Sequence, residues 1–269
     1  MKLRKEFIVR PGTKMKLADY DPEATPGFKK GAEEQEATAK SIERLDKLQY
    51  LLAAENKHAV LVVLQGMDGS GKYGTIRHVM SGLNPQACKV ACFKVPTPEE
   101  AGHDFLWRIH HAVPARGQIG IFNRSHYEDV LAVRVHGLVP KRVWSKRYEQ
   151  INHFERYLVD NSVIILKFFL HISKDEQRKR ILQRMDDPDR NWKLSPADFA
   201  ERKYWPDYRK AYEAVLTRCS TPAAPWFIIP ANKKWYRNLA VARILVETLG
   251  ALDMKFPKPA FNLSRVTLK

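Results

Sequence analysis

The stretch "LQGMDGSGKYG", residues 64–74, has the residue types and spacing of a loop that binds phosphate. From Gly66 to Lys72 it follows the pattern G-x-x-x-x-G-K, in which backbone N–H groups converge on an anion. We therefore expect Gly69 and Gly71 to present backbone donors and Lys72 to reach the outer phosphates. The simpler alternative is a glycine-rich turn that binds no ligand.

Two residues of this stretch are unusual for such a loop. Tyr73 stands where phosphate-binding loops carry the Ser or Thr hydroxyl that binds Mg²⁺. Asp68 puts a carboxylate among groups that bind an anion, which repels phosphate unless it holds a cation or takes a proton from the attacking group. We therefore predict that Asp68 carries the metal. The alternative is that Asp68 only caps the following helix.

A second group of polar residues lies in "IFNRSHYEDV", directly after an apolar run that ends at Phe122. Asn123 takes the position where a phosphate-loop protein usually has an Asp for Mg²⁺. Arg124 is suited to clamp a phosphoryl group. Glu128 and Asp129 could orient cationic side chains or bind a metal through water; alternatively, they only cap the next helix.

A third group is the cation-rich segment "SKDEQRKRILQRMDDPDRNWKLS", residues 173–195. Arg180 and Arg184 share one helix face, and Arg190 and Lys193 follow the turn "DDPD". A helix and turn with clustered cations predict a lid over phosphates. An ordinary solvated helix face with weak ion pairs is the competing interpretation.

The elements that would position these groups alternate along the chain. Apolar runs predict strands near residues 58–65, 89–95, 118–122, 162–172 and 225–231. Between and around them, helical patterns occupy about 33–55, 74–83, 99–112, 127–135, 141–160, 175 onward and 235–250. We therefore expect an α/β fold with a mainly parallel sheet covered on both faces. The predicted organisation is an arm at 1–32 and one domain at 33–269 that includes the lid at about 173–200.

The chain of 269 residues has a formal charge of +16, which attracts polyanions such as nucleic acid, anionic lipid or polyphosphate. A basic surface that only maintains solubility is the alternative. The apolar runs are too short to cross a bilayer and no signal-peptide pattern follows the first residues, so we expect a cytoplasmic protein. Cys88 and Cys92, four apart in a predicted strand, are interpreted as buried thiols.

Taken together, these segments resemble the family-2 polyphosphate kinases. The likeness covers nearly the whole chain and rests on "VRPG", "GMDGSGK", "FKVPTPEE", "HDFLWRIH", "GIFNRSHYEDVL", "ILKFFLHISKDEQRKR", "NWKLS" and "APWFIIPANKKWYRN". The "NRSHYEDV" version is similar to the subgroup that phosphorylates both nucleoside mono- and diphosphates, class III. Tyr73 departs from the family pattern, in which Asp is usual at this position.

The resemblance implies a three-layer P-loop kinase-like fold with a helical lid, and phosphoryl transfer between inorganic polyphosphate and AMP or ADP, or GMP or GDP. It implies Mg²⁺, or Mn²⁺ in its place, and matches Asp68, Lys72 and Arg124 to the family's catalytic positions, with Asp68 as the metal ligand. We assign polyphosphate to Gly69, Gly71, Arg178, Arg180, Arg184 and Lys193, and the nucleotide to Asn123, Tyr127, Glu128 and Asp129.

Two other functions stay open at this stage. One is an ATP-dependent nucleotide kinase of similar fold, and the other is a non-catalytic protein that binds polyanions. The sequence has no recognised nucleic-acid motif, so we expect no nucleic-acid partner and no membrane partner. We expect a homo-oligomer, either a dimer or a tetramer.

Overall fold

The computed structural model describes residues 2–262, apart from the side chains of Lys193, Ala197 and Asp198. At its centre lies a five-stranded sheet of order β2-β3-β1-β4-β5, and each pairing between these strands is parallel. The strands are β1 (Ala59–Gln65), β2 (Cys88–Cys92), β3 (Ile119–Asn123), β4 (Val163–His171) and β5 (Trp226–Pro230). The parallel sheet predicted from the sequence is therefore confirmed.

The central strand β1 is buried along its whole length. Its sequence, "AVLVVLQ", is a run of apolar residues because a strand covered on both faces needs apolar side chains on both. The register places Leu64 beside Asn123 of β3 and Gln65 beside Phe169 of β4. The carboxyl ends of β1 and β3 are thus neighbours, so the segments that follow them meet at one edge of the sheet.

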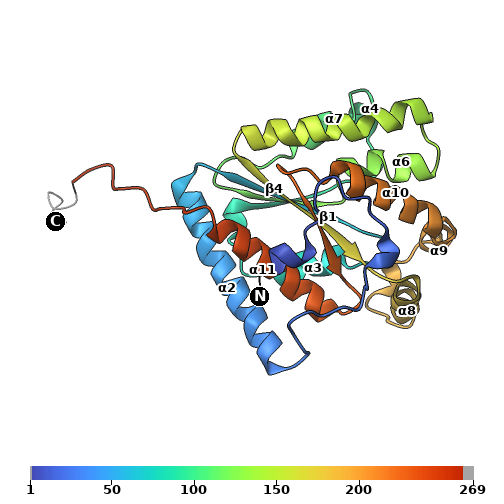
Figure 1. Cartoon of the computed structure of the whole chain (residues 1–269), viewed down its shortest axis with the longest axis horizontal. Coiled ribbons are helices and arrows are strands. Elements are labelled where there is room, and N and C mark those ends of the chain that lie inside the picture. The colour runs from blue at the N-terminus through green and yellow to red at the C-terminus, as the bar shows by residue number, and fades with distance from the viewer. Residues whose placement is uncertain (1, 263–269) are drawn as a thin grey trace.

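Helices cover both faces of the sheet (Figure 1). On one face, α11 (Lys234–Gly250) packs against α2 (Ala32–Glu55) and α3 (Lys72–Val79). On the other face, α10 (Trp205–Cys219) packs against α7 (Lys141–Asp160) and α6 (Ala132–Val135). The observed architecture is the three-layer α/β arrangement expected from the alternation of strands and helices.

The segment predicted as a lid follows β4 and lies beside the start of α10, on the right of Figure 1. It begins with α8 (Lys174–Met185) and continues through η4 (Asn191–Lys193) and α9 (Pro196–Ala200). The turn η5 (Glu201–Tyr204) then leads directly into α10. The other short helical turns are α1 (Leu3–Phe7), η1 (Leu17–Asp19), η2 (Pro85–Ala87), α4 (Pro98–Ala101), α5 (Trp107–His111) and η3 (His126–Asp129).

The helix predicted over residues 99–112 is divided into two short helices, α4 and α5. Thr97 and Glu100 form a reciprocal capping box that starts α4. The Asp104 carboxylate then accepts a hydrogen bond from the backbone N–H of Leu106 at 2.9 Å, which favours a turn over a continuing helix. The prediction of one helix was wrong because it followed the apolar spacing and overlooked these turn-forming side chains.

The N-terminal segment lies across the body of the protein and is held by its backbone. Leu3, Val9 and Leu17 are buried in the core. The N–H of Val9 donates to the carbonyl of Trp226 at 2.8 Å, and the carbonyl of Val9 accepts from the Ser220 hydroxyl at 2.6 Å. The segment therefore adds apolar residues to the domain core.

Two further sequence expectations concern the cysteines and the membrane. Cys88 is half-buried but Cys92 is exposed, so the interpretation of both as buried thiols was wrong for Cys92. The reason is that β2 is an edge strand with incomplete cover. Within residues 2–262, the structure contains no helix with the length and apolar character needed to span a bilayer.

Candidate active site

The phosphate-loop candidate lies between β1 and α3, as predicted from the sequence. The turn runs from Gly66 to Gly71, and α3 starts at Lys72. Gly71 has φ of +101°, and a Cβ atom built there would lie 1.7 Å from Nη1 of Arg237. Glycine is therefore required at this position both by the backbone conformation and by the closely packed arginine.

Side chains from two helices hold the carbonyl groups of this loop. Gln177 of α8 donates to the carbonyl of Asp68 at 2.8 Å. Arg180 of α8 donates to the carbonyls of Gly69 and Ser70 at 2.8 and 3.2 Å, and Arg237 of α11 reaches the Ser70 carbonyl at 3.3 Å. The loop's shape thus depends on α8 and α11 as well as on its own glycines.

Arg180 does not face a ligand, contrary to the prediction that it closes over polyphosphate. Its side chain is 6% exposed, and its Nη2 donates to the carbonyls of Ala231 and Asn232 at 2.6 and 2.8 Å. Its Nε pairs with Glu176 at 2.7 Å. Every N–H group of the guanidinium therefore donates to an oxygen of the chain itself, and Arg180 stabilises the loop through the loop's carbonyls.

The other cations predicted for the lid are Arg178, Arg184 and Lys193, and the structure describes the side chains of the first two. Arg178 is exposed and Arg184 is half-buried on the same helix, α8. The side chain of Lys193 lies outside the described residues, so its contact with polyphosphate stays a prediction. Because Gln177 and Arg180 bind α8 to the loop, we expect any lid movement to begin after this anchored turn.

Three charged residues meet where the loop faces the end of β3. The carboxylate of Asp68 accepts from Nη2 of Arg124 at 3.0 Å, and both side chains are partly exposed, at 37% and 43%. The ammonium of Lys72 donates to the carbonyls of Gly66 and Met67 at 2.7 and 3.3 Å. Burial lowers the pKa of Lys72, and the nearby Asp68 carboxylate opposes that shift. The sequence-predicted trio Asp68, Lys72 and Arg124 is therefore brought together.

Arg124 reaches this position from an unfavourable backbone conformation. Its φ is +62°, in the left-handed region that residues other than glycine rarely adopt. The N–H of Arg124 donates to the carbonyl of Leu64 at 3.2 Å. Next to it, the buried hydroxyl of Ser125 accepts from Gln65 and from the N–H of Tyr127, each at 3.2 Å. Contacts on both sides thus hold the strained residue in place.

The acidic residues after β3 contact cations rather than the end of a helix. The Glu128 carboxylate lies 4.0 Å from Nη1 of Arg124, and Asp129 accepts from Arg147 at 2.8 Å. Burial raises the pKa of Asp129, and the Arg147 guanidinium opposes the shift. Ser125 supplies the side-chain cap of η3. The alternative that Glu128 and Asp129 are merely capping residues therefore finds no support in these contacts.

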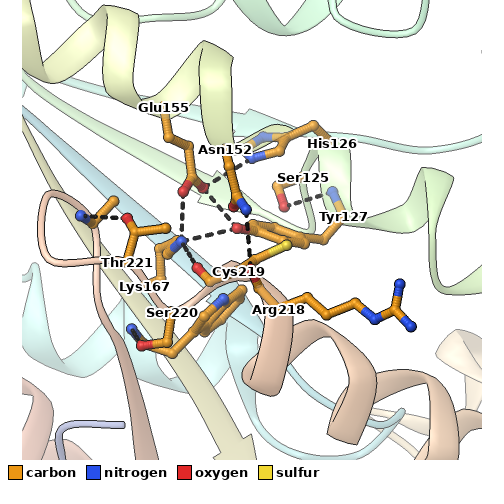
Figure 2. Close-up of polar contacts among 12 residues, drawn as sticks. Ser125, His126, Tyr127, Asn152, Glu155, Lys167, Arg218, Cys219, Ser220 and Thr221 are labelled. Atoms are coloured by element: carbon orange, nitrogen blue, oxygen red, sulfur yellow. Dashed lines mark hydrogen bonds and ion pairs between the residues drawn. The ribbon is translucent and has the colours of Figure 1, made fainter. Parts of the chain in front are cut away.

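Asn123 and Tyr127 were both assigned to the nucleotide, and the structure separates them. Asn123 is half-buried at the carboxyl end of β3, where its amide approaches the thiol of Cys92 at 3.7 Å. Tyr127 is 0% exposed, and its hydroxyl contacts Glu155 and Lys167 inside the core (Figure 2). The prediction that Tyr127 binds the nucleotide was therefore wrong.

Sequence reasoning missed two tyrosines that α10 brings close to the site. The hydroxyl of Tyr212 lies 3.4 Å from the Gln65 side chain, and Tyr208 lies one turn earlier on the helix. Burial, followed by the negative charges of Glu201 and Glu128, raises the pKa of the Tyr208 hydroxyl. No sequence signal marked these residues, because their contacts depend on how α10 packs against the sheet.

The side chains at the loop suit a hard divalent cation that is shared with substrate. Among residues 2–262, no group of three or more His, Cys, Asp or Glu side chains is arranged to hold a metal ion. Asp68 nevertheless offers a partly exposed carboxylate beside the loop. Mg²⁺ typically takes one or two protein carboxylates and completes its shell with phosphate oxygens and water, so the donor set fits that ion.

Comparisons with known proteins identify the relatives of this chain. A sequence model of the family described as polyphosphate kinase 2 (PPK2) matches residues 28–257. An AMP/ADP-polyphosphate phosphotransferase from Meiothermus ruber is 51% identical over 98% of this chain and 100% of its own length. An ADP-polyphosphate phosphotransferase from Rhodopseudomonas palustris is 46% identical over 96% of this chain and 94% of its own.

The fold is shared with a solved structure as well. The crystal structure of polyphosphate kinase 2 from Arthrobacter aurescens superposes with a TM-score of 0.90 at 44% identity, covering 95% of this chain and 92% of that one. The P-loop kinase-like fold expected from the sequence is thereby confirmed. The match of the family model and the near full-length likeness lead to one conclusion: this chain is a phosphotransferase that belongs to the polyphosphate kinase 2 family.

Proposed function

We propose that the protein transfers phosphoryl groups between inorganic polyphosphate and both AMP and ADP, with Mg²⁺ bound through Asp68. The observation that carries the proposal is the convergence of Asp68 and Arg124, 3.0 Å apart, beside Lys72 on a glycine-rich loop. The choice of acceptors is supported by the Meiothermus ruber relative, an AMP/ADP-polyphosphate phosphotransferase that shares 51% identity across 98% of this chain.

Each charged residue has a role in this proposal. Lys72 and Arg124 brace the phosphoryl group in transfer and neutralise charge on its oxygens. Asp68 orients the acceptor phosphate, and a bound Mg²⁺ would supply further neutralisation of phosphate charge. Catalysis of phosphoryl transfer is mainly positioning and electrostatics, so a rigid loop with few nucleophilic groups is adequate.

The residues after β3 would orient the nucleotide. Asn123 and Glu128 flank Arg124 at the carboxyl edge of the sheet, where parallel α/β proteins bind ligands. Asp129 is held by Arg147, which lies 4.8 Å from the ring of Phe105. We assign Asn123 and Glu128 to direct contact and Asp129 to contact through Arg147 or water.

The excess positive charge would serve the long donor. Arg178 and Arg184 on α8 form the proposed start of a cationic path for polyphosphate, and Lys193 is assigned to that path from the sequence alone. The formal charge of +16 is consistent with a surface that attracts a polyanion over a distance. Capture of polyphosphate should weaken as salt is raised, because counterions compete for these cations.

Two alternatives give different results in one assay. The protein is incubated with Mg²⁺ and each of AMP, ADP, GMP and GDP, with polyphosphate or ATP as the sole donor, and the nucleotides are separated. We expect AMP and ADP to be phosphorylated from polyphosphate. Product from ATP alone would favour the ATP-dependent kinase, and no product with either donor would favour a non-catalytic polyanion binder. Product from ADP with AMP inert would contradict the dual-acceptor assignment.

We also infer a cytoplasmic homo-oligomer, a dimer or a tetramer. The oligomer is supported by the edge strand β2, on which Val90 and Cys92 are exposed. Light scattering on the purified protein gives the mass directly, and a mass of one 31.1 kDa chain would contradict it.

A further inference from the structure

A group of buried polar side chains surrounds Tyr127 in the core (Figure 2). The Lys167 ammonium donates to Oε2 of Glu155 at 2.5 Å, to the Tyr127 hydroxyl at 2.9 Å and to the carbonyl of Cys219 at 2.7 Å. The Tyr127 hydroxyl in turn donates to Oε1 of Glu155 at 2.8 Å. All three donors of the ammonium are therefore used.

This group is buried to an unusual degree for charged residues. Lys167 and Tyr127 are 0% exposed, and Glu155 is 1% exposed. Burial acts to raise the pKa of Glu155, but Lys167 and His126 outweigh it, so the pKa lies below its ordinary value and the carboxylate stays ionised. Lys167 is a charged residue in the otherwise apolar run of β4. Apolar residues of similar volume often stabilise a core as well as a buried ion pair does, so stability alone is a weak reason for this arrangement.

The group connects directly to the strained catalytic turn. Tyr127 lies three residues after Arg124, whose φ is +62°. Ser125, between them, is tied to Gln65 at the end of β1 and to the N–H of Tyr127. A residue keeps a sparsely populated backbone conformation only when the contacts around it hold it there. The turn is fixed to α7 because the Tyr127 hydroxyl and Nε2 of His126 both contact Oε1 of Glu155, at 2.8 and 3.2 Å. Tyr127 also fixes the turn to β4 through Lys167.

We propose that Tyr127, Glu155 and Lys167 form a positioning cluster that holds Arg124 in its left-handed conformation and so sets its approach to Asp68. The cluster acts through Arg124 and does not touch substrate. This inference rests on the proposed role of Arg124 in binding the phosphoryl group.

Tyr127→Phe is the most conservative test, because it removes only the hydroxyl that contacts Glu155 and Lys167 and leaves the contact between His126 and Glu155 in place. We expect kcat to fall about tenfold, equivalent to about 1.4 kcal/mol of barrier, while KM for ADP and for polyphosphate changes less than about twofold. The ring keeps its packing against Trp226, 4.8 Å between centroids. Unchanged kcat in this variant would overturn the proposal.

Tyr236→Phe is the matched control. Tyr236 is also 0% exposed, and its hydroxyl donates to the carbonyl of Pro26 at 3.0 Å. It belongs to α11, on the face of the sheet opposite to α7 and α10. Each substitution removes one buried hydroxyl, so both should lower the melting temperature by a few degrees. We expect kcat to fall only in Tyr127→Phe. Equal loss of kcat in the two variants would show a general effect of stability and overturn the proposal.

The double variant Glu155→Leu/Lys167→Met removes both charges and keeps the core apolar. We expect it to fold with some loss of stability, since neither charge is left buried without the other but His126 and the Tyr127 hydroxyl lose Glu155 as a partner. We also expect it to lose at least as much kcat as Tyr127→Phe. If it folds with the kcat of the wild type, the proposal fails. If the double variant does not fold, the kcat of Tyr127→Phe alone decides whether the positioning cluster is accepted or rejected.

A double-mutant cycle separates this inference from the proposed function. Arg124→Ala alone should greatly reduce kcat, and retention of activity would refute the assigned role of Arg124 itself. In the Arg124→Ala background, Tyr127→Phe should have no further effect on the residual rate, because the cluster acts through the removed side chain. An additive loss would leave the role of Arg124 intact and reject the positioning cluster.

Discussion

Gln177 of α8 donates its side-chain amide to the backbone carbonyl of Asp68 at 2.8 Å, while its own oxygen accepts from Arg202 at 2.7 Å. One buried amide thus links the residue proposed to bind the metal to Arg202 of η5, the turn that leads into α10. The position of the Asp68 carboxylate depends on this link, because the carbonyl belongs to the same residue.

Gln177→Leu should therefore disturb the site while largely preserving the fold. The substitution removes the donor to Asp68 and leaves that carbonyl without this partner, which should cost about 1–3 kcal/mol of unfolding free energy. We expect a rise in the Mg²⁺ concentration needed for half-maximal rate. Initial rates across a Mg²⁺ series, with urea unfolding in parallel, measure both effects. An unaltered Mg²⁺ requirement would mean that Gln177 does not position Asp68.

Gly71→Ala should abolish activity through a steric clash with Arg237. The added Cβ would lie 1.7 Å from Nη1, so the arginine or the loop must move. Gly137→Ala is the control, because Gly137 also has positive φ, +62°, but a Cβ there meets no atom within 4 Å. Circular dichroism and rate measurements should show modest destabilisation with activity retained for Gly137→Ala. Normal activity of Gly71→Ala would contradict the tight packing seen here.

Arg180→Ala and Arg184→Ala should differ sharply although the two residues share a helix face. Removing Arg180 leaves several buried carbonyls and Glu176 without their donor, which should cost about 3–5 kcal/mol of stability. Arg184→Ala should leave the melting temperature unchanged and raise KM for polyphosphate. This KM should also depend less on salt concentration than that of the wild type. Thermal unfolding and rates over a salt series test both. A KM effect without destabilisation in Arg180→Ala would restore the ligand-binding interpretation of that residue.

Asp68→Asn should abolish transfer without unfolding the protein, since the amide keeps the shape of the side chain but loses the charge that attracts Mg²⁺. Tyr73 is 63% exposed at the position of the usual hydroxyl ligand. Tyr73→Ser should change the rate by no more than about tenfold, or about 1.4 kcal/mol, and Tyr73→Asp should be tolerated. The measurement is the Mg²⁺ dependence of initial rate. A sharp drop in the Mg²⁺ concentration needed by Tyr73→Ser, or near-normal activity of Asp68→Asn, would show that Asp68 is not the residue that binds the metal.

The sequence predicted the sheet well because buried parallel strands have a distinctive composition. β4 was predicted from "SVIILKFFLHI" despite Lys167 in its middle, since a single charge does not obscure so long an apolar run. Helix α7 matches its predicted bounds, Lys141 to Asp160. The association of Asp68 with Arg124 also followed from sequence, because both residues come directly after strands whose carboxyl ends are neighbours.

What the sequence could not predict was the direction in which single side chains point. Arg178 and Arg180 lie two residues apart on α8, yet one is exposed and the other is buried against the phosphate loop. Their orientation depends on how α8 docks, which is a tertiary contact. Tyr127 was misassigned for the same reason, since its partners Glu155 and Lys167 are 28 and 40 residues away.

The backbone pairing of Val9 with Trp226 bears on how the chain is synthesised and folded. Val9 is synthesised 211 residues before Ser220, whose hydroxyl its carbonyl binds, and its other backbone partner, Trp226, lies still later in β5. Leu3, Val9 and Leu17 cannot be fully buried until β5 has been synthesised, so these apolar side chains stay exposed while residues 18–225 are made. The segment that contains them must therefore avoid aggregation during that interval.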